Sequence, residues 1–120
     1  DKADDWVIST GLNYSVRDFT LKAFDKLGII LEFSGNGTDE IGVVKTLNTS
    51  SSNLKEGDIV VRVDKNYFRP TEVENLLGDS TKARKLLKWN PKYNFETLVD
   101  DMIQSDLEIA KNDLIIKNKF

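Results

Sequence analysis

An arginine and a glutamate three positions apart are the side chains of this sequence best suited to binding a ligand. Arg69 precedes Pro70, and Glu72 lies in the segment that follows. The proline favours an extended Arg69, because its ring crowds the preceding residue out of the helical region. Glu72 would then lie in the first turn of a helix, where the helix dipole favours a carboxylate. The pattern predicts a cation and an anion at a strand-to-helix corner.

This corner has two interpretations. In α/β proteins, phosphorylated ligands commonly bind where a strand leads into a helix, and an arginine fork can hold a diphosphate through two hydrogen bonds. A carboxylate such as that of Glu72 can accept hydrogen bonds from sugar hydroxyls. The alternative is that Arg69 and Glu72 only pair with each other, which contributes roughly a few tenths of a kcal/mol. The stretch alone leaves both interpretations open.

The composition removes several classes of chemistry. The 120 residues include no histidine and no cysteine, which excludes Ser–His and Cys–His catalysis, disulfides and zinc sites built on these residues. A net charge of −3 without a basic block is untypical of nucleic-acid binding, and no apolar run is long enough to span a membrane. A carboxylate-based hydrolase is an alternative, but solvated charge explains its candidate acids better: Asp4, Asp5, Asp100, Asp101 and Asp106.

Four strands are predicted from short runs of apolar and β-branched residues. They cover residues 6–10, 29–33, 41–45 and 59–63, and the first is expected to be buried. Their order along the chain, with a helix after the first strand and further helices after the last, is typical of an α/β protein. Because the strands are few, we expect them to form part of a larger sheet.

The helices are predicted from capping residues and apolar spacing. Ser15 and Asp18 match a capping box that opens the first helix. Residues 73–77 predict a short amphipathic turn, and Asp79 and Asn94 are the expected caps of two later helices. The helix after Asp79 carries basic residues that we interpret as a solvated face: Lys82, Arg84, Lys85 and Lys88.

We predict one domain over residues 1–120, with a polar insertion loop at about residues 46–57 that is rich in Ser, Thr and Asn. The sequence starts at Asp1 without an initiator methionine or a signal peptide. We therefore expect a piece of a longer protein.

Several blocks of the sequence resemble one enzyme family. Residues 67–73 read Tyr-Phe-Arg-Pro-Thr-Glu-Val, and residues 5–11 read Asp-Trp-Val-Ile-Ser-Thr-Gly. Further matching pieces are Ser-Val-Arg-Asp-Phe at 15–19, Leu-Gly-Asp at 77–79, Thr-Lys-Ala at 81–83, Leu-Lys-Trp at 87–89 and Pro91. Together these blocks resemble the C-terminal part of the GDP-mannose 4,6-dehydratase family, which consists of extended short-chain dehydrogenase-type, Rossmann-like enzymes.

The resemblance implies that the chain is the substrate-binding portion of such an enzyme, with the Rossmann domain absent. Members of the family are lyases that convert GDP-mannose to GDP-4-keto-6-deoxymannose, a precursor of GDP-fucose, with bound NADP. The residues implied to contact the GDP part are Arg69 and Glu72, with Asn66 and Tyr67 as secondary candidates. The resemblance also implies a cytoplasmic enzyme that is a homo-oligomer when full length and has an N-terminal nucleotide-binding domain.

The family's cofactor and catalytic motifs are absent from this sequence. It has no Gly-x-x-Gly-x-x-Gly stretch, and the Gly-Asn-Gly at residues 35–37 is expected to form a turn instead. The Tyr-x-x-x-Lys pair is also missing, because the residues four places after the three tyrosines are Asp18, Thr71 and Thr97. We therefore expect no catalytic, cofactor-binding or metal-binding residue in this chain, and no activity from the chain alone.

Two alternatives accompany this interpretation. The chain could be the substrate domain of a related nucleotide-sugar epimerase or reductase, since the missing half would build much of the sugar pocket. It could instead be a free-standing binding module without catalysis. An exposed apolar surface where a nucleotide-binding domain should dock would argue against the free-standing module.

Overall fold

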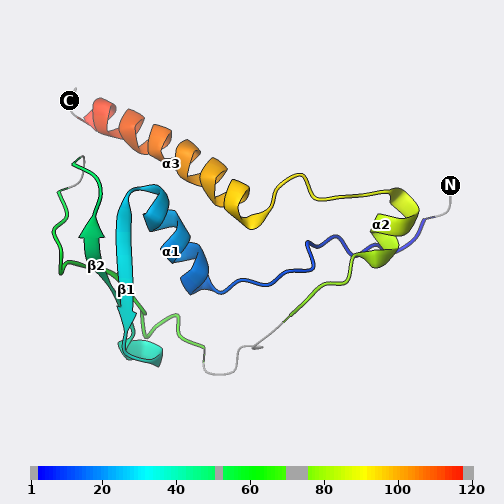
Figure 1. Cartoon of the computed structure of the whole chain (residues 1–120), viewed down its shortest axis with the longest axis horizontal. Coiled ribbons are helices and arrows are strands. Elements are labelled where there is room, and N and C mark those ends of the chain that lie inside the picture. Colours follow the sequence, from blue (N-terminus) through cyan, green and yellow to red (C-terminus); the bar gives the residue numbers. More distant parts are fainter. Residues whose placement is uncertain (1–2, 51–52, 70–75, 118–120) are drawn as a thin grey trace.

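The structure, a computed structural model, describes residues 3–50, 53–69 and 76–117 (Figure 1). In chain order its elements are α1 (Val16–Lys26), β1 (Ile29–Ser34), the 3₁₀ helix η1 (Gly37–Asp39), β2 (Ile41–Leu47), β3 (Ile59–Arg62), α2 (Thr81–Leu87) and α3 (Phe95–Lys117). This confirms a small α/β arrangement in which the three later predicted strands and the helices expected after Ser15, Asp79 and Asn94 all form. The N-cap of α2 is Ser80 instead of the expected Asp79, whose carboxylate accepts the backbone N–H of Thr81 at 2.9 Å.

The three strands form an antiparallel sheet in the order β1-β2-β3. Its buried core consists of Ile29, Leu31 and Val44, and Leu21 and Phe24 of α1 pack against them. Because β2 continues to Leu47, the connection to β3 begins two residues later than the polar loop expected from the sequence.

A complete capping box starts α1, as the sequence predicts. The backbone N–H of Asp18 donates to the Ser15 hydroxyl at 3.0 Å, and the backbone N–H of Ser15 donates to the Asp18 carboxylate at 2.9 Å. The Ser15 hydroxyl also donates to that carboxylate. The Asp18 carboxylate thus accepts bonds from the hydroxyl and from the backbone N–H of Ser15, and these two bonds hold the pKa of Asp18 below its ordinary value. The capping box therefore depends on an ionised Asp18.

Helix α3 lies along α1 on the side away from the sheet, so the elements form three layers (Figure 1). Val99 of α3 is fully buried. Two ion pairs join the helices, Lys22 to Glu96 at 2.6 Å and Lys26 to Asp100 at 2.7 Å. Beyond Ile103 the described residues of α3 are all exposed.

The Gly-Asn-Gly stretch forms the tight turn that follows β1. Gly35 has a φ of 86°, and a Cβ at this position would lie 2.4 Å from the carbonyl oxygen of Asp39. The turn leads into η1 and then β2, with no α-helix after it. It therefore lacks the loop-to-helix geometry with which phosphates are bound at a helix N-terminus.

One predicted element is wrong, and a second is described only at its end. Residues 6–10 form no strand, and Leu76 and Leu77 are not helical. A strand requires a hydrogen-bonded neighbour, and the backbone groups of residues 6–9 bond to no other described residue. The side chains of Leu76 and Leu77 are 78% and 64% exposed, so no burial stabilises a helical turn there. Residues 73–75 lie outside the described part.

The N-terminal segment packs with α2 at the opposite end of the molecule from the sheet (Figure 1). The radius of gyration is 19.0 Å and the principal extents are 55 × 38 × 28 Å, whereas a compact domain of this length has a radius of about 14 Å. The described residues therefore form an elongated structure with two ends. The sheet end contains α1 and the three strands, and the α2 end consists of residues 3–12, residues 76–80 and α2.

The sheet end should depend on the packing of Val44. The side chain of Val44 is 2% exposed, so Val44→Ala removes buried methyl groups and should lower the free energy of unfolding by about 2 kcal/mol. Val16→Ala is the matched control, because Val16 is 83% exposed and its change should lie within about 0.5 kcal/mol. Urea denaturation measures both, and equal effects would contradict the assigned core.

The capping box should be visible in the titration of Asp18. Ser15→Ala removes the hydroxyl that stabilises the carboxylate, so the pKa of Asp18 should rise towards its ordinary value of about 3.9. Asp79 is the internal control, because its lowered pKa depends on hydrogen bonds from Thr81 and should not change. NMR-monitored pH titration measures both groups.

The same shift gives the capping box a pH dependence. A lowered pKa in the folded state contributes stability above the ordinary pKa, and this contribution is lost as pH falls through the folded-state pKa. Asp18→Asn should remove that part of the acid dependence. An unchanged Asp18 titration in Ser15→Ala would show that the hydroxyl does not set the shift.

Candidate functional site

The loop that carries the candidate ligand-binding residues begins directly after β3. Asp64 organises its first turn, because its carboxylate accepts the backbone N–H of Asn66 at 2.8 Å and its carbonyl oxygen accepts the N–H of Tyr67 at 3.1 Å. An aspartate that accepts a hydrogen bond from the backbone two residues later stabilises a turn. The Asp-x-Asn spacing could have indicated this turn, although the role of Asp64 was not predicted.

The predicted site residues within the described part all lie in solvent. Tyr67 is 82% exposed, and Asn66 and Arg69 are also exposed. Arg69 has no hydrogen-bond or ion-pair partner among the residues that the structure describes. Glu72 lies outside them, so the interpretation of the two residues as a simple ion pair stays untested.

Lys82, Lys85 and Lys88 are exposed, as expected for a solvated basic face, whereas Arg84 is half-buried. Two of these residues also have partners. Lys82 pairs with Asp4 at 2.7 Å, and its ammonium lies 4.7 Å from the ring centroid of Trp6. Arg84 donates to the carbonyl oxygen of Thr10 at 3.2 Å. These two side chains attach the N-terminal segment to α2. Lys82 contacts a carboxylate and an aromatic face of the segment, and Arg84 contacts one of its carbonyl oxygens.

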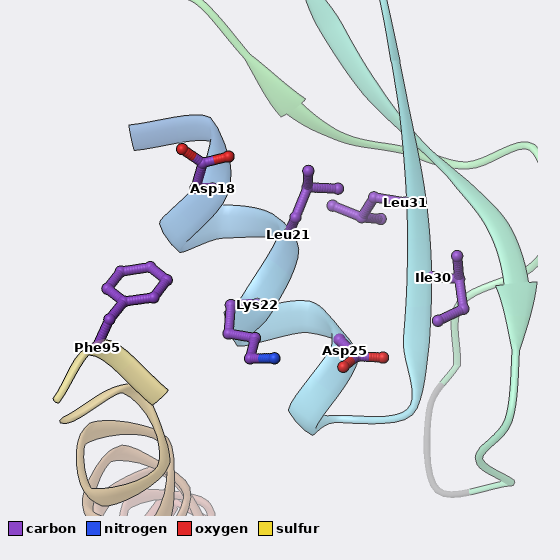
Figure 2. Close-up of a pocket in the computed structure, with 7 residues that line it drawn as sticks. All are labelled: Asp18, Leu21, Lys22, Asp25, Ile30, Leu31 and Phe95. Atoms are coloured by element: carbon purple, nitrogen blue, oxygen red, sulfur yellow. The ribbon is translucent and has the colours of Figure 1, made fainter. Parts of the chain in front are cut away.

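An open hollow of about 310 Å³ lies between α1, β1 and the start of α3 (Figure 2). Its floor is apolar, with Leu21, Leu31 and Phe95 among its lining residues. Its polar side chains include two with partners: Asp18 bonds to Ser15, and Lys22 pairs with Glu96. The lining also holds a second carboxylate, that of Asp25, which lies near the opposite end of α1 from Asp18 (Figure 2).

A smaller hollow of about 110 Å³ lies where the N-terminal segment meets the start of α3. Its aromatic lining includes Tyr14 and Phe95, whose rings stack with centroids 3.9 Å apart and an interplanar angle of 8°. The sequence analysis did not predict this pair of rings. The stacking fixes the N-terminal segment against α3.

The acids considered for a hydrolase are used in other ways or lie exposed. Asp4 pairs with Lys82, and hydrogen bonds from Lys82 and from the backbone of Asp5 lower its pKa. Asp100 pairs with Lys26. A general acid at neutral pH needs a raised pKa, so Asp4 is poorly suited to that role. No three potential metal-ligating side chains come together in the part of the chain that the structure describes.

The described helices also include none that is both long and apolar enough to cross a bilayer.

Comparison with known proteins identifies the relatives of this chain. Residues 1–102 match the family model for GDP-mannose 4,6 dehydratase. The chain is 48% identical over 118 residues to a GDP-mannose 4,6-dehydratase of Vibrio cholerae serotype O1, covering 98% of this chain and 32% of that protein. A dehydratase of the same description from Yersinia enterocolitica is 42% identical, with the same two coverages. One from Dictyostelium discoideum is 40% identical, covering 93% of this chain and 29% of its own length.

This chain thus spans about a third of the length of the relatives it matches. The family model covers most of its residues, including the Arg69 loop and the segment attached to α2. The chain belongs to the GDP-mannose 4,6-dehydratase family.

Proposed function

We propose that this chain is the GDP-sugar-binding, C-terminal portion of a GDP-mannose 4,6-dehydratase. The observation that carries the proposal is the position of Arg69. Arg69 follows a turn fixed by Asp64, is exposed, and has no partner among the described residues. The relatives of the chain are named for GDP-mannose. Arg69 lies in the loop seven residues after the end of β3, not at the strand-to-helix corner itself, and an available guanidinium there suits a diphosphate.

In this proposal Arg69 holds the diphosphate through two hydrogen bonds, and the Glu72 carboxylate accepts hydrogen bonds from sugar hydroxyls. Asn66 and Tyr67 flank the ligand as secondary contacts. These residues bind and orient the substrate. The chain acts as one substrate-binding unit over residues 1–120, and the loop at about residues 46–57 takes no part in chemistry.

The cofactor of the proposed enzyme is NADP, bound by an N-terminal portion that corresponds to the length this chain does not cover. The described residues do not fit NADP, because the glycine turn at 35–37 leads into η1 and a strand. We assign no catalytic step to this chain. The whole enzyme would be a cytoplasmic lyase and a homo-oligomer that supplies GDP-4-keto-6-deoxymannose for GDP-fucose synthesis.

A free-standing binding module is less favoured by the surface of the α2 end. Several large apolar side chains are largely exposed there, and they include Val7, Ile8, Leu76, Leu77, Leu86 and Leu87. Such a surface is unusual for a module that functions alone. A related epimerase or reductase is less favoured because the matched family and the relatives named above are dehydratases.

The proposed role of Arg69 is tested by exchanging it for a residue of the same charge. Arg69→Lys keeps the cation but loses the planar fork, so GDP should bind about tenfold more weakly. Arg62→Lys is the matched control, because Arg62 lies at the end of β3, is exposed, and should leave GDP binding unchanged. NMR titration with GDP measures the dissociation constants.

This comparison should be made in the chain and in a joined enzyme, meaning the chain fused to the portion of the Vibrio cholerae relative that it does not cover. If Arg69→Lys weakens GDP binding no more than Arg62→Lys in the joined enzyme, Arg69 does not bind the diphosphate.

Catalysis should require the joined enzyme. We expect turnover of GDP-mannose with NADP in the joined enzyme and none in the chain alone, because no cofactor site is proposed in the chain. Product formation followed by chromatography measures this. NADP-dependent turnover by the chain alone would contradict the proposed division of labour.

A further inference from the structure

The turn between β3 and Arg69 is held by a single side chain. The Asp64 carboxylate accepts the backbone N–H of Asn66 at 2.8 Å, and the Asp64 carbonyl oxygen accepts the N–H of Tyr67 at 3.1 Å. Residues 64–67 are all exposed, so no apolar burial orders them. The conformation of the turn therefore depends on these two hydrogen bonds, and the side-chain bond is the one that the residue type supplies.

This turn removes most of the conformational freedom between the sheet and Arg69. β3 ends two residues before Asp64, the turn occupies residues 64–67, and the proline after Arg69 favours an extended backbone at Arg69. Without the side-chain bond of Asp64, the whole connection from the end of β3 to Arg69 would be flexible. Ordering that connection when a ligand binds would oppose binding, because the lost backbone entropy would have to be offset by the contacts with the ligand.

The charge of Asp64 is not what the loop requires. None of the ion pairs in the described part of the chain includes Asp64. A carboxylate on a loop that binds a diphosphate repels the ligand, so the charge alone would weaken GDP binding. The hydrogen bond to Asn66 acts in the opposite direction, because it orders the loop before the ligand arrives.

We propose that Asp64 is a positioning residue of the GDP-sugar site. Its carboxylate holds the turn that presents Arg69 to the diphosphate, and it acts through Arg69 without touching the ligand. This inference rests on the proposed function, which assigns the diphosphate to Arg69, and it adds the residue that orders the binding loop.

Two substitutions that both remove the charge test the proposal in the joined enzyme. Asp64→Ala also removes the acceptor oxygen, so GDP should bind about tenfold more weakly, although loss of the charge alone would tighten binding. Asp64→Asn keeps an oxygen that can accept the N–H of Asn66, so GDP should bind at least as tightly as in the unchanged enzyme. Calorimetry measures the dissociation constants. Unweakened binding in Asp64→Ala, or equally weakened binding in both variants, would overturn the proposal.

Asp58 provides a matched control at the other end of β3. Its carboxylate accepts the backbone N–H of Lys55 at 2.8 Å, which is a bond of the same kind in a turn outside the proposed site. Asp58→Ala should leave the dissociation constant for GDP within about twofold of the unchanged enzyme. If Asp58→Ala weakens GDP binding as much as Asp64→Ala, the effect of Asp64 is not specific to the Arg69 loop and the proposal fails.

The turn itself can be followed in the chain without GDP. The amide proton of Asn66 loses its acceptor in Asp64→Ala and should exchange with water about tenfold faster, whereas Asp64→Asn should leave the rate unchanged. NMR-monitored hydrogen exchange measures both rates. An unchanged rate in Asp64→Ala would show that the side chain does not hold the turn, and would overturn the proposal.

A double-substitution cycle shows whether Asp64 acts through Arg69. In an Arg69→Ala enzyme, Asp64→Ala should weaken GDP binding by no more than about twofold, because the residue that the turn positions is gone. An undiminished tenfold loss in that enzyme would contradict a positioning role.

Failure of this inference can be distinguished from failure of the proposed GDP site. GDP binding that is weakened by Arg69→Lys but not by Asp64→Ala would support the site and overturn the role of Asp64. GDP binding that Arg69→Lys leaves unchanged would contradict the site itself, and the positioning role would fail with it.

Discussion

The packing of α1 against β1 is the contact on which the sheet end of this chain depends. It buries Ile29, Leu31 and Val44 beneath Leu21 and Phe24, and apolar burial of this kind is the dominant stabilising force in folding. Helix α3 then adds to α1 through Val99 and two ion pairs. Because the ion pairs are partly exposed, they contribute little stability and mainly fix how the helices align.

The α2 end follows a different principle. Its contacts are hydrogen bonds, one ion pair and cation–π contacts made by Lys82 and Arg84, while its leucines remain in water. Such contacts orient a segment but bury little apolar area, so they cannot replace a core. The Arg69 loop lies in the sequence between β3 and this end.

The sequence predicted those elements whose stabilising partners lie within the chain. The capping box of Ser15 and Asp18, the strand at residues 29–33 and the cap at Asn94 are all confirmed, because each depends on neighbours in sequence or on the local core. The strand at residues 6–10 is absent because it has no partner strand among the described residues. A strand-like sequence pattern indicates only that the segment fits a half-buried sheet surface. The strand forms only when a neighbouring strand is present to pair with it.

The candidate site shows the same limit. The exposure of Arg69 agrees with a ligand-binding role, but a single sequence could not show that Asp64 fixes the turn before it or that Lys82 and Arg84 attach the N-terminal segment. These contacts join residues up to 77 positions apart, which periodicity does not report. The family was readable because residues 67–73 combine residue types that local structure alone does not require.

The central claim is that this chain supplies one part of a GDP-sugar site whose remainder lies in the length it does not cover. The most direct test is the affinity for GDP, measured by calorimetry for the chain and for the joined enzyme under the same conditions. Our account predicts binding at least tenfold tighter, or about 1.4 kcal/mol, in the joined enzyme. Equal affinities would show that the chain's own residues form the whole site, and would contradict the account.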